Sequence, residues 1–245
     1  MEAILGFAIA LAISLTGVGA GTLTTPILII FLGVPPAIAV GTALAFSVIV
    51  KVASVPFYAL HRNINMRVLG LLLIGGVPGV IVGSLLLDRF KHGTYQKPIF
   101  VALGVFITSA AVLRLYRLFR PRTVPPKPRA HWLPWLTFPI GAEVGFSSAG
   151  AGALGSLLLL GMTNLSTAEV VGTDLSFGLG LSLVGSGIHV SAGNYDSALL
   201  AKLAIGGVLG ALTGSASAGR VAQRPLRIAL LLTLIALGLR LAWQT

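Results

Sequence analysis

The chain has 245 residues, of which 56% are hydrophobic and 9% are charged, and its formal net charge is +11. Soluble domains carry about 25% charged residues, so this chain has too few charges to cover a water-exposed surface, and lipid is its expected solvent. The 17 Lys and Arg residues lie mostly in short tracts between apolar segments, which speaks against nucleic acid as a partner. Cysteine is absent, which excludes disulfides and thiolate chemistry.

Eight apolar segments, most of them near or above the roughly 20 residues that span a bilayer, predict an all-α integral membrane protein. In chain order they cover residues 3–33, 36–59, 68–87, 98–118, 132–162, 167–190, 198–218 and 226–243. The largest polar break runs from Arg114 to His131 and holds six Lys and Arg residues and four prolines. We therefore predict a first half over 1–118, a cytoplasmic basic linker over 119–131 and a second half over 132–245.

The two halves align without a gap when the sequence is shifted by 131 positions. Matching landmarks include Gly19 with Gly150, Gly21 with Gly152, Gly41 with Gly172, Thr42 with Thr173, Gly79 with Gly210, and Arg89 with Arg220. Compositional bias would not keep so many matches in one register. We therefore predict an internal duplication that folds into two pseudo-symmetric halves.

The first segment of each half, 3–33 or 132–162, is long for one membrane crossing and short for two. A Gly-rich stretch lies at each centre, and glycine loosens a helix there. Two re-entrant hairpins would give three crossings per half, inverted halves, and eleven Lys and Arg on the linker side against five. If 132–162 spans fully, the split is ten against six. The positive-inside rule favours the hairpins slightly and places the linker in the cytoplasm in both cases.

Four strings, at 17–28, 35–42, 169–175 and 193–196, carry a family resemblance that extends over nearly the whole chain. In this order and duplicated arrangement they resemble the TauE/SafE family, also called the toluene sulfonate uptake permeases. Two strings depart from it: Gly19-Ala20-Gly21 replaces three glycines, and 62–65 lacks the usual glycine and acidic residue. The resemblance implies a transporter of small anions such as sulfite, sulfonates or related sulfur-containing organic acids.

The Gly-rich turns are the predicted substrate site. A helix N-terminus presents about four unpaired N–H groups and a partial positive charge, and broken transporter helices aim such ends at anions. The predicted substrate-binding residues are Gly19, Ala20, Gly21, Thr22, Thr42, Ser147, Ser148, Gly150, Gly152 and Thr173. The alternative is close helix packing by small residues. For the stripe of Gly75, Gly76, Gly79 and Gly83, packing is the favoured interpretation.

Four ionisable residues inside apolar segments are candidates for charge compensation or proton coupling, because a charge at that depth usually faces protein or water. Lys51 could attract an anion or extend toward the headgroups. Glu143 could carry a proton or pair with a basic residue, and Asp174 could carry a proton or open a helix. His189, near the end of a span, could transfer protons, whereas Glu169 is interpreted as a helix cap.

The prediction is a secondary transporter that binds a small anion between its halves and alternates access, with proton coupling as an open option. An anion channel is the main alternative, followed by a membrane enzyme or accessory subunit and a structural subunit. No metal-ligand spacing, P-loop or dinucleotide motif occurs, so we expect no enzymatic activity, metal or cofactor. The expected partners are the anion and the lipid of an inner or plasma membrane, and a homo-oligomer is compatible with the sequence.

Overall fold

The computed structural model describes residues 2–16, 20–91, 96–119, 130–149, 151–217 and 223–243. Within these ranges the chain forms ten α-helices, one short 3₁₀ turn at Ala130–Trp132 and no strand, which confirms the all-α prediction. The helices are α1 Glu2–Thr16, α2 Ala20–Leu32, α3 Pro36–Leu60, α4 Met66–Phe90, α5 Gln96–Phe119, α6 Leu133–Ser147, α7 Ala151–Met162, α8 Thr167–Ser191, α9 Ser197–Ser217 and α10 Gln223–Trp243. Eight predicted segments become ten helices because 3–33 and 132–162 each contain two.

Capping side chains define the starts of two of the long helices. The Asn65 side chain accepts a hydrogen bond from the Val68 amide at 3.1 Å and caps α4. Before α8, the Ser166 amide and hydroxyl donate to the Glu169 carboxylate at 2.9 and 2.8 Å, and the Glu169 amide returns a bond to Ser166. This reciprocal capping box confirms the role expected of Glu169.

The helix bounds repeat at the offset found in the sequence. Adding 131 to the bounds of α1 gives those of α6, and adding 131 to the bounds of α3 gives those of α8. The other helices of the first half fall on α7, α9 and α10 in the same order, with ends that differ by a few residues. The two sequence halves therefore adopt the same succession of two short helices and three longer ones.

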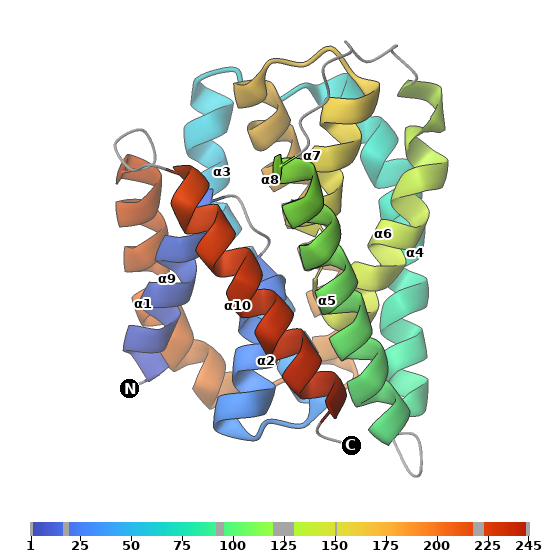
Figure 1. Cartoon of the computed structure of the whole chain (residues 1–245), viewed down its shortest axis with the longest axis vertical. Helices are drawn as coiled ribbons and strands as arrows, with labels where there is room; N and C mark the ends of the chain where they lie inside the picture. The colour runs from blue at the N-terminus through green and yellow to red at the C-terminus, as the bar shows by residue number, and fades with distance from the viewer. Residues whose placement is uncertain are drawn as a thin grey trace.

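The two short helices of each half form a re-entrant hairpin. In Figure 1, α1 rises from the lower end to mid-height and α2 returns downward, whereas α6 descends from the upper end and α7 returns upward. The helices after each hairpin then run in opposite directions in the two halves, so the halves are inverted. Each short helix has 12 to 15 residues. At 1.5 Å per residue each reaches at most about 22 Å, less than the roughly 30 Å of a hydrocarbon core.

Four helices, α3, α4, α8 and α9, are long and apolar enough to cross a membrane, and α5 and α10 contain shorter apolar stretches. Large apolar side chains also cover much of the outside, and several are more than half exposed. Examples on α4 and α9 are Ile74, Leu85, Ile205, Leu209 and Leu212. An exposed apolar surface of this extent requires lipid rather than water around it.

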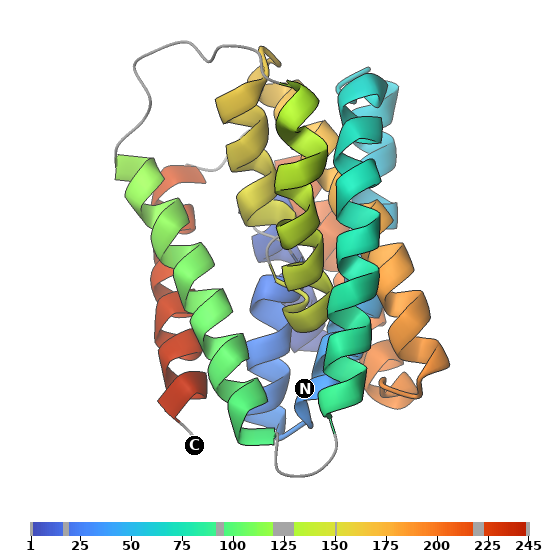
Figure 2. The ribbon, with the colours of Figure 1, turned by 90° about the vertical axis from the view of Figure 1, so that its right-hand side faces the viewer.

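The halves interlock through glycine stripes. An added Cβ at Gly75, Gly79 or Gly83 of α4 would strike a backbone carbonyl oxygen of α6. Gly206 and Gly210 of α9 meet the backbone of α1 in the same way. The first helix of each half therefore packs against the fourth helix of the other half, as Figure 2 shows for α4 and α6. This confirms the packing interpretation of the Gly75–Gly83 stripe.

Helices α3 and α8 lie at the centre and occupy equivalent positions in the two halves. Phe46 of α3 and Phe177 of α8 are both fully buried. The ring of Phe46 lies against Gly207, and the ring of Phe177 lies against Gly76, so each aromatic ring fills the space that a glycine leaves in the fourth helix of the other half. These contacts fix the centre of the molecule, and the polar groups described below lie around it.

Candidate functional site

The break between α6 and α7 contacts the start of α2. Helix α6 ends at Ser147, and Ser148 follows with a left-handed backbone, φ 58°. Its carbonyl oxygen lies so close to Gly21 that any added Cβ at Gly21 would strike it. Glycine at position 21 is therefore what allows the interrupted segments of the two halves to approach this closely.

Hydroxyl groups tie the two breaks together. The Ser148 hydroxyl donates to the Gly21 carbonyl oxygen at 3.1 Å and also contacts the Thr25 hydroxyl. Ser147 donates to the Glu143 carbonyl at 3.0 Å, and its oxygen accepts the Ala149 amide at 3.2 Å. The two serines predicted as substrate donors thus shape the break and join it to the other half.

Thr22 is different, because its hydroxyl is buried and unused. It lies in the first turn of α2 and is 1% exposed. Its Oγ1 atom has no hydrogen-bond partner among the described residues. A buried hydroxyl without a partner costs free energy, and buried polar groups are nearly always satisfied in folded proteins. Thr22 therefore offers a polar contact that a ligand between the two breaks could take up.

The remaining predicted turn residues divide by position. Gly19 and Gly150 lie outside the described residues. Ala20 and Gly152 belong to the first turns of α2 and α7, where helical amides lack partners four residues earlier. The Gly152 carbonyl accepts the Ser156 hydroxyl at 3.0 Å, and contact of Gly152 with substrate stays a prediction.

Thr42 and Thr173 anchor turns. The Thr42 hydroxyl accepts the Asp196 amide at 3.0 Å, and the Thr173 hydroxyl accepts the Asn65 amide at 3.0 Å. The four residues are two equivalent pairs, related by the same offset of 131. Both threonines are fully buried. Their hydroxyls hold the turn that follows α3 or α8 against the other half, and contact of either hydroxyl with substrate stays a prediction.

Lys51 lies buried between the two central helices. It is 4% exposed, and its ammonium donates to the Ser182 hydroxyl of α8 at 3.1 Å. Ser47 lies one turn before it on α3 and contacts the same hydroxyl at 3.0 Å. Extension of Lys51 toward the headgroups, one alternative from the sequence, does not fit this burial.

Two buried carboxylates lie on the second half. Glu143 is 8% exposed, and its Oε1 atom has no hydrogen-bond partner among the described residues. Asp174 is 5% exposed, lies against Gly155 of α7 and attracts Lys51 electrostatically. Because α8 already begins at Thr167, Asp174 lies two turns inside the helix and the helix-opening alternative is wrong.

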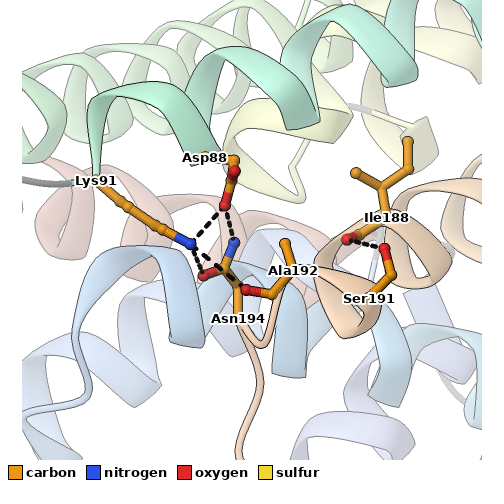
Figure 3. Close-up of polar contacts among 6 residues, drawn as sticks. All are labelled: Asp88, Lys91, Ile188, Ser191, Ala192 and Asn194. Atoms are coloured by element: carbon orange, nitrogen blue, oxygen red, sulfur yellow. Dashed lines mark hydrogen bonds and ion pairs between the residues drawn. The ribbon is translucent and has the colours of Figure 1, made fainter.

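A polar network connects α4 to the turn between α8 and α9, as Figure 3 shows. Lys91 donates to Asp88 at 2.6 Å and to the Asn194 side chain at 2.9 Å, and Asn194 donates to Asp88 at 2.7 Å. His189, which is fully buried nearby in α8, has a ring nitrogen 3.1 Å from the Gly145 carbonyl. His189 thus lies in the last turn of α8, close in sequence to the turn that carries Asn194.

Sequence reasoning missed several members of these clusters. Ser182 could have been found, because it is the residue that the 131 offset assigns to Lys51. Thr25 and Ser47 gave no signal beyond a small polar side chain in an apolar segment. Asp88 and Lys91 lie in a short polar stretch between two apolar segments, and a sequence does not show which turn of the other half lies beside them.

The fold and these clusters define a class of protein. Two inverted halves, each opening with a broken hairpin, meet at polar groups buried between lipid-facing helices, which is the architecture of secondary membrane transporters. The family model described as sulfite exporter TauE/SafE matches residues 3–241. The chain therefore belongs to the TauE/SafE family, and it is a multi-pass membrane transporter.

One curated relative supports the same assignment. The "Probable membrane transporter protein YjnA" of Bacillus subtilis (strain 168) is 32% identical over 249 residues, which cover 97% of each chain. No solved structure is significantly similar to this chain. The family and the relative's name indicate transport, and neither name describes catalysis.

Proposed function

We propose that this transporter carries a small anion, such as sulfite, an organosulfonate or a related sulfur-containing or carboxylate anion, across the inner or plasma membrane. The observation that carries the proposal is the meeting of the two helix breaks, at Gly21 and Ser148, beside a buried hydroxyl of Thr22 that has no partner among the described residues. The description of the family as sulfite exporters agrees with this substrate class.

The chemistry of the breaks suits an anion. The first turns of α2 and α7 each present unpaired amides and the positive end of a helix dipole. These helices have 13 and 12 residues, long enough for that dipole to develop. An oxyanion between them would accept hydrogen bonds from the amides and from Thr22. The positive ends of the two helix dipoles favour an anion over a cation at this position.

The inverted halves supply a mechanism. When two structurally equivalent halves differ slightly in tilt, exchanging their conformations closes the path to one side of the membrane and opens it to the other. The glycine contacts between α4 and α6 and between α1 and α9 bring the backbones of each helix pair into direct contact, which couples the two helices of the pair. Each hairpin then moves with the long helix of the opposite half, while the anion stays between the breaks.

Glu143 is the residue we propose for proton coupling. Ser147, which shapes the break, lies one turn after it and bonds to its backbone carbonyl. A buried carboxylate without a compensating partner costs several kcal/mol when ionised. A proton on Glu143 removes that cost and also removes its repulsion of a nearby anion, so proton and anion bind together. Glu143→Gln should therefore transport without a response to a pH gradient.

Reconstituted transport tests the proposal. Purified protein in liposomes should take up radiolabelled sulfite, an alkanesulfonate or a carboxylate above protein-free liposomes, saturably and faster when the same anion is preloaded inside. Such countertransport distinguishes a carrier from a channel. If none of these anions is taken up while a cation or neutral solute is, the proposed substrate class is wrong.

Thr22→Val separates a binding role from a structural one. Because the hydroxyl has no hydrogen-bond partner among the described residues, its removal should leave stability unchanged or slightly higher. Loss of one hydrogen bond to the anion should raise KM for uptake about two- to tenfold. The matched control is Thr233→Val, since the exposed Thr233 hydroxyl bonds only within its own helix, to Ala229. An unchanged KM in Thr22→Val would remove Thr22 from the site.

A further inference from the structure

Lys51 and Ser182 are equivalent residues of the two halves, and they touch each other. They are 131 positions apart, the offset of the duplication, and the Lys51 ammonium lies 3.1 Å from the Ser182 hydroxyl. A pseudo-twofold rotation that exchanges the halves moves each of these residues onto the other. Two positions that exchange and are also in contact must lie beside the rotation axis.

This axis passes through the middle of the central helices. Lys51 is three residues beyond the midpoint of α3, which runs from Pro36 to Leu60. Three residues are about 4.5 Å of helix, so the ammonium lies near mid-depth. The neighbouring contact between Ser47 and Ser182 fits the same crossing point. Lys51 therefore lies near the middle of α3 and beside the axis.

The Lys51 ammonium has more hydrogen-bond donors than the described residues engage. An ammonium carries three N–H groups, and within the described part of the chain one hydrogen bond, to Ser182, engages them. Lys51 is also the one Lys or Arg that is buried among the described residues. Asp174 also attracts it electrostatically. A buried cation with unused donors at this depth costs free energy unless a ligand offsets it.

We propose that Lys51 is the counter-charge of the transported anion. The proposal rests on the proposed function and adds to it the residue that meets the substrate's charge. Its position explains why one lysine is enough. A charge on the axis keeps the same distance from both faces when the halves exchange conformations, so it can accompany the anion in both access states.

The duplication provides a sharp test, because the charge can be transferred to the equivalent position. Lys51→Ser should raise KM for anion uptake about tenfold or more, the effect of losing a charged hydrogen-bond partner. The double variant Lys51→Ser with Ser182→Lys returns a lysine to the other side of the axis and should recover most of the loss. If Lys51 had only a structural role, a lysine at position 182 of the opposite helix would not recover the KM.

Lys202→Ser is the matched control, since Lys202 is 57% exposed and pairs with Glu2 at the surface. Its KM should equal that of the unaltered protein. Equal KM values for Lys51→Ser and the unaltered protein overturn the proposal and leave anion transport intact. If the unaltered protein itself transports no anion, the proposed function fails instead, so the two failures are distinguishable.

A second variant, Lys51→Cys, tests the proposal even if Lys51→Ser does not fold. The chain has no cysteine, so Lys51→Cys carries a single reactive thiol. Reaction with aminoethyl methanethiosulfonate recreates a cationic side chain of similar length, and methyl methanethiosulfonate gives a neutral one. Recovery of uptake after the cationic reagent alone supports the proposal. Equal uptake after both reagents overturns it.

Discussion

The two halves agree in their backbone contacts and differ in their charges. Thr42 and Thr173 each accept an amide from the turn opposite, and Gly41 and Gly172 each lie against a carbonyl of that turn. The buried charged and titratable residues are not repeated between the halves. Positions equivalent to Lys51, Glu143, Asp174 and His189 hold Ser182, Ala12, Ala43 and Tyr58. The framework needs symmetry because both halves move in the same way, whereas one anion needs only one set of charges.

The two ends of the molecule differ in the same manner. At the end opposite the linker, Asp88, Lys91 and Asn194 join α4 to the α8–α9 turn (Figure 3). In the sequence of the second half, the positions equivalent to Asp88 and Lys91 hold Gly219 and Ala222, whose side chains cannot form an ion pair. The same substitution made at equivalent positions of the two halves should therefore have equal effects at the backbone contacts and unequal effects at the charged residues.

The largest effect is expected at the glycine stripes. Gly79→Val and Gly210→Val should both destabilise strongly, at or above the roughly 1–3 kcal/mol of overpacking, because the new side chains strike the Phe138 and Phe7 carbonyls. Thermal denaturation in detergent measures this. Gly70→Val is the control, since nothing lies near a Cβ there. A stable Gly210→Val beside an unstable Gly79→Val would show that the halves do not pack equivalently.

A smaller effect is expected at the polar network. Asp88→Asn should lower stability by about 1 kcal/mol, because a charged hydrogen bond is lost but the group is 35% exposed and partly screened. The loss should shrink at high salt. Glu2→Gln, which breaks the exposed pair with Lys202, should change the melting temperature less. Equal shifts for the two variants would mean that the network adds nothing beyond a surface ion pair.

An effect of about the same size is expected at the turn anchors. Thr42→Val and Thr173→Val should each cost about 0.5–1.5 kcal/mol, the contribution of one neutral hydrogen bond, and the two costs should be similar. KM for anion uptake should not change in either variant. A raised KM with unchanged stability would instead support the prediction that these hydroxyls contact substrate.

The fold could be predicted from the sequence in most respects. Length and hydropathy gave the membrane class, and the 131 offset gave the repeat whose helix bounds the structure reproduces in α1 and α6. The glycines around Gly21 and Gly152 indicated where the helices are interrupted. Proline often ends a helix, but α2 continues through Pro26. These features can be read from the sequence because they do not depend on knowing the tertiary contacts.

The site could be predicted only in part, because its contacts join distant residues. The sequence singled out Ser148 and Gly21, which touch. It did not show that Thr42 would be engaged by a turn 154 residues away. Nor did it show that Lys51 would face its own equivalent, which requires the halves to be inverted and crossed at α3 and α8. An apolar segment predicts that its residues avoid water, but it does not predict which residues of the other half they contact.

The central claim is that an anion binds where the two helix breaks meet, and a bound heavy-atom analogue tests it most directly. Crystals grown with selenite, a heavier relative of sulfite, should give an anomalous selenium peak within hydrogen-bonding reach of Thr22 and the first-turn amides of α2 and α7. A peak confined to another part of the molecule, in protein that transports selenite, would contradict the account.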